Sequence, residues 1–465
     1  MKKIAFMVIG FLSTPSLFAS TDLLAAYQQA AKNNGTYQAA VATYKAAGYN
    51  VPIARAALLP SAVIGANIGA NQQNPAAPGT PANFNSSGYS LTLTQPLLNI
   101  GAWYAYSEVE ATYKQAAATF AAAQQNLIMT TATAYFGVLE AQEQLKYAQA
   151  NEDSLAEQLR QVEAQYKVGL KAQTDVQATR ASYESAVAST IAAQNSLNNA
   201  MENLTAVTGQ NDGDLTPLKQ DFPLVKPDPQ NAETWVNYGL KNNVNLQFQQ
   251  FQAEITHTQI KTDFTNYFIP TINAVGSYSN FNNPISTSQT GAVAGTYTNG
   301  SVATTTGELA LNYNVFNGFG NQATVKQDKY TYQAAQANVL QTQRVTAANV
   351  RQAYLNVISD ISQVQALQQA VISGQVSLKA IRSGYLVGVR TIVDVLTEQS
   401  NLYNSQQQYT QAIYQYITDS LNLKEQAGSL NPQDIAAVNT WLETMPTAQV
   451  VTPNAVAAKS VDVPK

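Results

Sequence analysis

Residues able to carry covalent or metal chemistry are nearly absent from this chain. It contains no cysteine and a single histidine, His257, which excludes thiol catalysis, disulfides and thiolate metal sites and leaves little material for a histidine-based centre. Gly318, Phe319 and Gly320 begin a glycine-rich segment, but Ala323 stands where a nucleotide-binding loop has its third glycine. We therefore expect neither an enzyme nor a bound cofactor.

Charge is equally sparse. Only 12% of the 465 residues are charged, against about 25% in a typical protein, and the net charge is -4. The single basic pair, Lys2 and Lys3, is too short for a nucleic-acid surface, so we expect no nucleic-acid partner.

The first 19 residues are typical of a secretory signal peptide. Lys2 and Lys3 precede an apolar run from Ile4 to Leu12, and cleavage after Ala19 is expected. A buried N-terminal helix is the alternative. No later segment has about 18 consecutive apolar residues, so we expect no transmembrane helix.

The remainder of the sequence is an internal two-fold repeat. Gly169 matches Gly388 and Asp175 matches Asp394, both 219 residues apart. We expect repeat 1 at 20–215, a linker at 216–231, repeat 2 at 232–430, and a C-terminal equatorial segment and tail at 431–465.

Each repeat is expected to read helix, β-hairpin, long helix, tight turn and shorter helix. The long segments 102–168 and 320–387 lack proline and are rich in helix-forming residues, so each predicts a rod of roughly 100 Å. The shorter helices are expected at Leu23–Arg55, 173–208, Ala232–Asp263 and 391–427. Because two shorter helices nearly equal one rod in length, each repeat should pack a continuous rod beside a stacked pair.

An ordinary coiled-coil spacer is the alternative for the rods. Small residues on all sides, as in Ala116–Ala123, and the lack of a strict Leu/Ile seam argue against it. Such helices can pack on two neighbours at once and form a curved wall.

The hairpins, expected at 61–100 and 271–317, show period-two alternation. In the first, Ile64 and Ile68 alternate with Gly65 and Asn67. This pattern is typical of transmembrane strands with a lipid-facing and a lumen-facing side; a soluble sheet packed on the helices is the alternative. The polar segments Gln72–Ser87 and Asn282–Thr305 are expected to be extracellular loops.

Four strands cannot close a barrel, and a bilayer tolerates no open sheet edge. Three chains supply the simplest closed solution, a mainly α-helical trimer with a 12-stranded transmembrane β-barrel (4 strands per chain) and twelve helical segments around the same axis. At a helix spacing of ~10 Å, twelve helices surround a bore of roughly 28 Å.

At this point the chain closely resembles the TolC family of outer-membrane efflux proteins. The resemblance runs from Asp22 to about Leu442, and its strongest segment is Gly384–Leu396. It implies a homotrimer in the cell outer membrane that extends into the periplasm, with its β-barrel continuing into a 12-helix periplasmic α-barrel. It also implies work with a periplasmic adaptor protein and an inner-membrane transporter in drug efflux or type I secretion.

The family's gate residues are carried over at the helix tips. Tyr385 and Arg390 match residues that hold the entrance shut, with Thr174 and Asp175 as their partners. The alternative is that Thr174 and Asp175 merely cap a helix and that Arg390 is solvated.

The resemblance also implies a carboxylate ring at the entrance. Asp394 matches a ring residue, but Thr397 stands at the family's second acidic position, and Glu398 is the candidate substitute because it follows Asp394 by four residues on a helix. The alternative for Asp394 is a carboxylate favoured by a helix N-terminus.

The tips themselves are expected to receive the adaptor. Gly169 and Gly388 should end the long helices in the left-handed conformation, and the family's docking tips match Val168, Gly169 and Leu170, and Val387, Gly388 and Val389. Val389 replaces the family's threonine, so adaptor preference should differ.

The leading hypothesis is therefore a passive export duct gated at its periplasmic tips. A stand-alone porin and a secreted coiled-coil fibre or adhesin are the alternatives. A porin does not need the rods, and a fibre does not need the strands.

Overall fold

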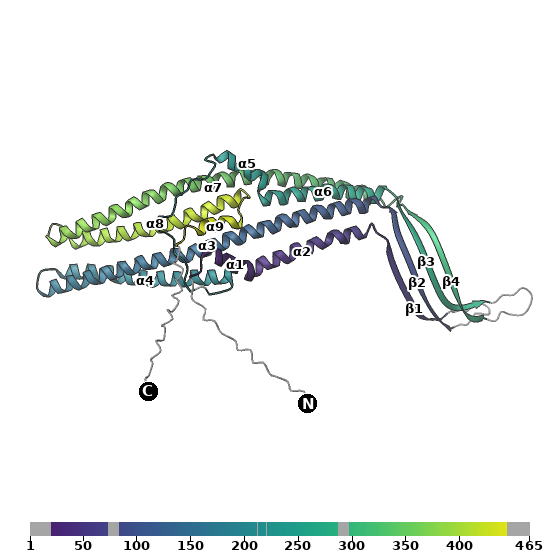
Figure 1. Cartoon of the computed structure of the whole chain (residues 1–465), viewed down its shortest axis with the longest axis horizontal. Coiled ribbons are helices and arrows are strands. Elements are labelled where there is room, and N and C mark those ends of the chain that lie inside the picture. The colour runs from purple at the N-terminus through teal and green to yellow at the C-terminus, as the bar shows by residue number, and fades with distance from the viewer. Residues whose placement is uncertain (1–19, 73–82, 212, 220, 287–296, 444–465) are drawn as a thin grey trace, which may run out of the picture.

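The computed structural model describes residues 20–72, 83–211, 213–219, 221–286 and 297–443. The expected signal peptide lies outside these residues, as do the middle of each expected loop and the C-terminal tail. The described chain is elongated, with helices along most of its length and a four-stranded sheet at one end (Figure 1).

Two very long helices run through the helical part of the molecule. α3 (Ile100–Lys167) has 68 residues and α7 (Gly320–Leu386) has 67, so each is about 100 Å long at 1.5 Å per residue. Shorter helices flank each rod toward its two ends: α1 (Leu23–Asn33), α2 (Gly35–Ala56) and α4 (Gln173–Thr208) lie along α3, and α5 (Ala232–Asn242), α6 (Val244–Phe268) and α8 (Ile392–Gln426) lie along α7. Both halves thus contain the inferred rod beside a stacked pair.

The segments 23–55 and 232–263, expected as single helices, are each broken in two, so that prediction was wrong. The breaks fall at Asn34 and Asn243, whose extended backbones start new helices and whose side chains accept hydrogen bonds from Tyr37 N (3.0 Å) and Leu246 N (3.1 Å). Each asparagine is therefore an N-cap. Asn34 Nδ2 also donates to a carbonyl at the end of α4, and Asn243 Nδ2 donates to one at the end of α8. Each break therefore contacts the C-terminal end of the helix stacked against it.

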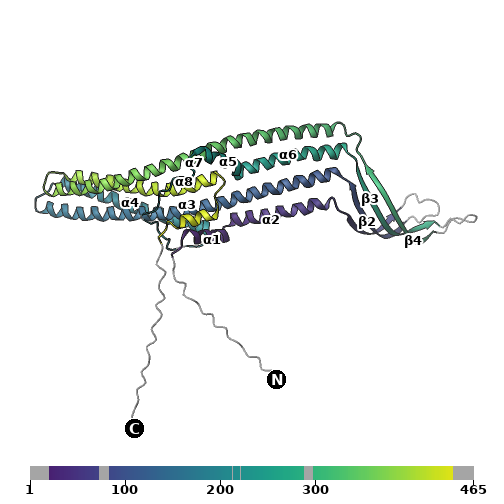
Figure 2. The same ribbon diagram turned by 45° about the horizontal axis from the view of Figure 1, so that its top comes forward.

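Toward the strands, four helices form a single layer. They lie side by side in the order α2, α3, α6, α7 (Figure 2). A helix between two neighbours must present packing surfaces on two sides, which the small residues distributed around these rods allow. Away from the strands, the same rods form two helical hairpins, α3 with α4 and α7 with α8.

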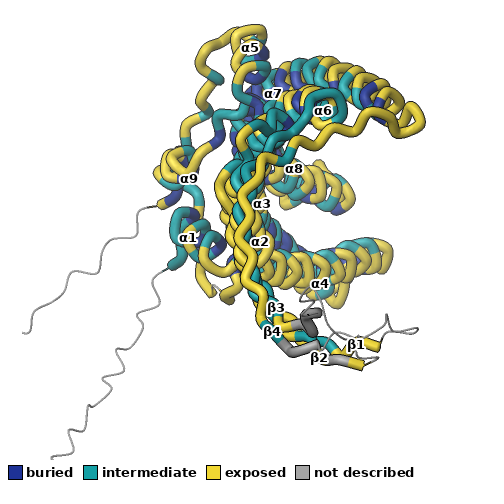
Figure 3. The backbone as a smooth tube through the Cα atoms, turned by 90° about the vertical axis from the view of Figure 1, so that its right-hand side faces the viewer, coloured by how far each residue is buried: buried dark blue, intermediate teal, exposed yellow. Residues whose placement is uncertain are grey.

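The main core lies where the stacked helices meet the rods. Tyr135 and Phe136 on α3 and Tyr416 and Ile417 on α8 are at most 1% exposed. In Figure 3 long stretches of the outlying tube are exposed, shown in yellow. The core therefore fixes the middle of the molecule and leaves both ends to project from it.

A short belt crosses this core. We define the belt as residues 213–219, 221–231 and 431–443, which include α9 (Pro432–Asn439). Thr21 pairs with Leu215, and Leu218 pairs with Leu442. The belt thereby ties both ends of the described chain to the segment between the two halves.

The sheet is antiparallel with the order β1-β2-β3-β4. Its strands are β1 (Ser61–Gln72), β2 (Asn83–Leu98), β3 (Thr271–Ser286) and β4 (Tyr297–Asn312). β2 pairs with β3, which joins the two hairpins. Within the described chain β1 and β4 are edge strands.

The strands are longer than the sequence had predicted. β2, β3 and β4 extend into the segments Gln72–Ser87 and Asn282–Thr305, which were expected to be loops. Their polar residues suggested loops, yet such residues also pair across strands, as Asn71 does when its Nδ2 donates to Ser86 Oγ at 2.8 Å.

The described helices leave both faces of the sheet uncovered (Figure 1). Ile64, Ile68 and Leu309 are 79%, 91% and 72% exposed. The alternative of a soluble sheet packed on the helices is therefore wrong.

Candidate functional site at the helix tips

Both helical hairpins end in the same type of turn. Gly169 and Gly388 have φ values of 76° and 82°, a left-handed conformation that glycine adopts without penalty. After each glycine the backbone turns back on the helix, with Leu170 N donating to Gln165 O and Val389 N to Gly384 O, both at 2.9 Å. The repeated glycines thus build two matching tips.

The side chains at these tips are apolar and point into solvent. Val168 and Leu170 of the first tip are 69% and 73% exposed, and Val387 and Val389 of the second are 75% and 74% exposed. Such an exposed apolar group at the end of an elongated molecule is typical of a protein-binding surface.

A small apolar cluster joins the two hairpins just inside the tips. Val162 of α3, Val176 of α4 and Ile392 of α8 are buried together, and Tyr385 and Leu396 pack against them. The structure therefore brings the two expected gate segments into contact.

The expected gate hydrogen bonds are not formed within the described chain. The hydroxyl of Tyr385 is buried and has no hydrogen-bond partner among the described residues, and the Lys171 Nζ lies 4.2 Å from the centre of the Tyr385 ring. Thr174 is exposed and Asp175 is half-buried at the start of α4. No hydrogen bond within the described chain joins either of them to Tyr385 or Arg390.

Arg390 is exposed and packs locally. Its aliphatic carbons lie close to Gly384, where an added Cβ would be 2.9 Å from Arg390 Cγ. The glycine therefore leaves room for the arginine stem to fold back against the end of α7.

A polar link that the sequence had not indicated joins the same two hairpins. One guanidinium nitrogen of Arg382 on α7 donates to Ser154 Oγ on α3 at 2.6 Å and to Gln399 Oε1 on α8 at 2.8 Å. Gln399 Nε2 in turn donates to Asn151 Oδ1 on α3 at 3.0 Å. We call these four residues, Asn151, Ser154, Arg382 and Gln399, the latch.

A signal for the latch was present in the sequence. Ile392, Val395 and Gln399 follow at helical spacing and are all buried, so an amide occupies a core-facing position. Gln399 is 5% exposed, and a buried amide requires polar partners.

Asp394 is built into the start of α8. Its Oδ2 accepts from the backbone N–H of Thr391 at 2.9 Å, and the Thr391 hydroxyl accepts from the Asp394 N–H at 3.2 Å, which is a capping box. Hydrogen bonding of the carboxylate to Thr391, to its backbone N–H first and then to its side chain, lowers the pKa of Asp394. The carboxylate thus has the helix-terminal role that the sequence left as an alternative.

The two other ring candidates follow on the same helix. Glu398 and Asp394 are both half-buried, whereas Thr397 is exposed. Because Glu398 follows Asp394 by four residues, the two carboxylates share one side of α8.

No described helix is both long enough and apolar enough to span a bilayer. Likewise, the described residues include no group of three or more His, Cys, Asp or Glu side chains suited to a metal ion.

The fold is that of solved outer-membrane channels. The Campylobacter jejuni outer membrane channel CmeC superposes with a TM-score of 0.73, covering 92% of this chain and 91% of CmeC at 17% identity. This likeness defines the architecture: long helical rods that end in a small sheet.

Sequence relationships define the family. Outer membrane protein TolC of Escherichia coli (strain K12) is 34% identical over 446 residues, covering 95% of this chain and 90% of TolC. Proteases secretion protein PrtF of Dickeya chrysanthemi is 27% identical, covering 91% of this chain and 92% of PrtF. The model of the outer membrane efflux protein family matches residues 26–210 and again 235–429. The chain therefore belongs to the outer membrane efflux protein family, a family of transport proteins whose place is the outer membrane.

Proposed function

We propose that this protein is the outer-membrane channel of tripartite efflux pumps and of type I secretion, a passive trimeric duct gated at its periplasmic tips. The observation that carries the proposal is an uncovered sheet with two free edges, continuous with rods of about 100 Å. A stand-alone porin needs no such rods, and a secreted fibre needs no uncovered sheet.

Assembly follows from the edges of the sheet. In a bilayer β1 and β4 must find partners, and three copies supply twelve strands and twelve helical segments. Exposed apolar residues along the helices, such as Leu355, Ile191 and Val376 at 57%, 66% and 66%, are surfaces that neighbouring copies would cover. The two separate matches of the family model support a two-fold repeat as the origin of this arrangement.

The gate is proposed at the joined tips. Tyr385 and Arg390 form no hydrogen bond with Thr174 or Asp175 of the same described chain. Those hydrogen bonds would therefore have to form between protomers. Within each protomer, the tip cluster and the latch hold α7 and α8 against α3 and α4. Because these contacts are few, they can break and form again reversibly.

Other proteins are proposed to dock at the tips and to supply the energy for transport. The exposed apolar tips at Val168–Leu170 and Val387–Val389 would receive a periplasmic adaptor, and an inner-membrane transporter would supply the energy. PrtF is by name a protease secretion protein, so secreted proteins are proposed as cargo beside small molecules.

Location and assembly state test this proposal together. In a cell expressing the full chain, we expect it in the outer-membrane fraction, as a trimer by native mass spectrometry after detergent extraction. A monomer in the soluble periplasm would overturn the proposal.

A further inference from the structure

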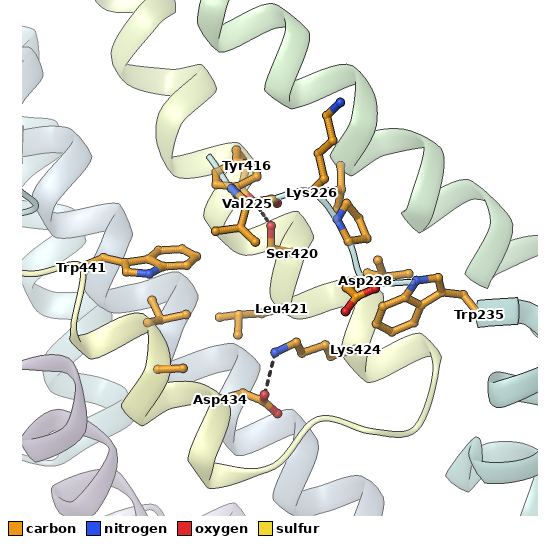
Figure 4. A pocket seen from close by; sticks show the side chains of 15 residues that line it. Val225, Lys226, Asp228, Trp235, Tyr416, Ser420, Leu421, Lys424, Asp434 and Trp441 are labelled. Atoms are coloured by element: carbon orange, nitrogen blue, oxygen red, sulfur yellow. Dashed lines mark hydrogen bonds and ion pairs between the residues drawn. The ribbon is translucent and has the colours of Figure 1, made fainter. Parts of the chain in front are cut away.

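A cavity of about 270 Å³ lies at the belt, far from the tips. It is partly open and is lined by the belt segment Val225–Asp228, the start of α5, Val357 of α7, the end of α8, α9 and Trp441 (Figure 4). Its size is just below the ~300–1,000 Å³ typical of small-molecule sites, so it suits a molecule with one or two rings.

Aromatic rings form much of the cavity wall. Trp235 and Trp441 stand on opposite sides of it, and Tyr416 lies near Trp441 (Figure 4). Two of the polar atoms on these rings are already used: Trp235 Nε1 donates to Pro229 O at 2.8 Å, and Tyr416 Oη accepts from Val225 N at 2.7 Å. Tyr416 is fully buried and stacks on Trp441, with the ring centroids 6.4 Å apart. The wall therefore offers the two tryptophan rings and aliphatic side chains more than hydrogen-bonding groups.

The charges around the cavity are unevenly balanced. Lys424 Nζ and Asp434 Oδ1 form an ion pair at 2.7 Å and neutralise each other. Asp228 lies beside Trp235 and forms no ion pair with a described residue, whereas the side chain of Lys226 extends away from both tryptophans (Figure 4). The uncompensated charge facing the cavity is thus one carboxylate.

We propose that this cavity binds a small organic cation with an aromatic or quaternary ammonium group. Tryptophan faces attract such cations through the ring quadrupole, and the Asp228 carboxylate adds a charge partner at the rim. An anion of the same shape would meet Asp228 with no free cation facing it. This site is separate from the duct and its gate, so it adds a ligand to the proposed function.

The test uses the full-length protein in detergent and isothermal titration calorimetry. The probe is benzyltrimethylammonium, compared with phenylacetate as an anion and benzyl alcohol as a neutral molecule. We expect one saturable site per chain for the cation and none for the anion. The Asp228→Asn and Trp235→Leu variants should each weaken cation binding by about five- to tenfold.

Two matched variants sharpen the result. Lys241→Gln removes a charge at the end of α5, outside the residues that line the cavity, so cation binding should stay unchanged. Trp235→Phe should retain most of the affinity because it keeps a ring face. If Trp235→Leu fails to assemble, Asp228→Asn alone provides the variant with weakened binding. Equal binding of all three probes, or an Asp228→Asn variant that binds the cation as wild type does, would overturn the proposal.

Discussion

Asp394 has a capping role in the structure and a ring role in the proposed trimer, and a single substitution can separate the two. Its carboxylate caps α8 through Thr391, and under three-fold symmetry three copies would form a ring with a strongly negative potential. Asparagine keeps an acceptor for the Thr391 N–H and removes the charge, whereas alanine removes both.

We expect Asp394→Asn to weaken cation selectivity and block by trivalent cations in planar bilayers, since a carboxylate ring attracts cations and offers them oxygen ligands. Thermal stability should change little in Asp394→Asn and fall in Asp394→Ala. Glu398→Ala tests for a second ring; a comparable loss places one there. If neither Asp394→Asn nor Glu398→Ala alters selectivity, Asp394 is a capping residue alone.

Asp360 is the second residue that leads to a prediction, here a change of stability with pH. It lies on α7, is nine-tenths buried, and its Oδ2 has no donor among the described residues. Burial, and then the neighbouring Asp419 carboxyl of α8, raise its pKa from 3.8 to about 7. The folded hairpin therefore favours a protonated Asp360.

The sign of the pH effect follows from linkage. Between about pH 4 and pH 7 the folded state holds a proton that the unfolded state has lost, so the stability of the α7–α8 packing should fall as pH rises through this window. Amide hydrogen exchange around residues 355–364 should accelerate accordingly. Asp360→Asn should flatten this dependence, and an unchanged profile in that variant would contradict the assignment.

At the scale of elements, the latch is the polar contact that joins α7 and α8 to α3. Arg382→Gln should loosen this contact because it removes charge-assisted hydrogen bonds worth about 1–2 kcal/mol. We expect hydrogen exchange at the start of α8 to rise by roughly tenfold.

Arg160→Gln is the matched control. Arg160 pairs with Glu157 on its own helix, and an exposed pair of this kind contributes little. Equal exchange in the Arg382 and Arg160 variants would mean that the latch does not hold the hairpins together.

The helix ends give a second test at this scale. Gly388 and Gly428 both have a left-handed backbone, but an added Cβ meets open space at Gly388 and the backbone of Asn242 and Asn243 at Gly428. Gly388→Ala should cost about 1 kcal/mol from the backbone alone. Gly428→Ala should cost about 3 kcal/mol, because the break between α5 and α6 must also shift. Melting of the assembled protein measures both, and equal melting temperatures would contradict the packing at Asn243.

The sequence predicted the rods well because their signals are local: helix-forming residues without proline, then a glycine that needs a positive φ. It missed the breaks at Asn34 and Asn243, since an asparagine cap inside a helical run depends on which neighbour its side chain reaches. The latch was missed for a related reason. Arg382, Ser154 and Gln399 come from three helices. Only the packing of these helices reveals that Arg382 donates hydrogen bonds to the other two.

At the scale of the whole molecule, a single chain leaves surfaces and side chains without the partners that the proposed function requires. Its sheet has free edges and uncovered faces, and its gate residues lack their expected partners. The proposed assembly of three copies around one axis would meet all of these needs in one step. We propose that this assembly forms a wide duct that its own helix tips keep closed.

Single-channel conductance in planar bilayers tests that claim most directly. Wild-type trimers should conduct far less than an open bore of roughly 28 Å would allow, and trimers with both Tyr385→Phe and Arg390→Ser should conduct severalfold more. Trimer mass and melting temperature of the double variant must match wild type for the comparison to hold. An unchanged conductance in intact double-variant trimers, or a wild-type channel that is already wide open, would contradict the account.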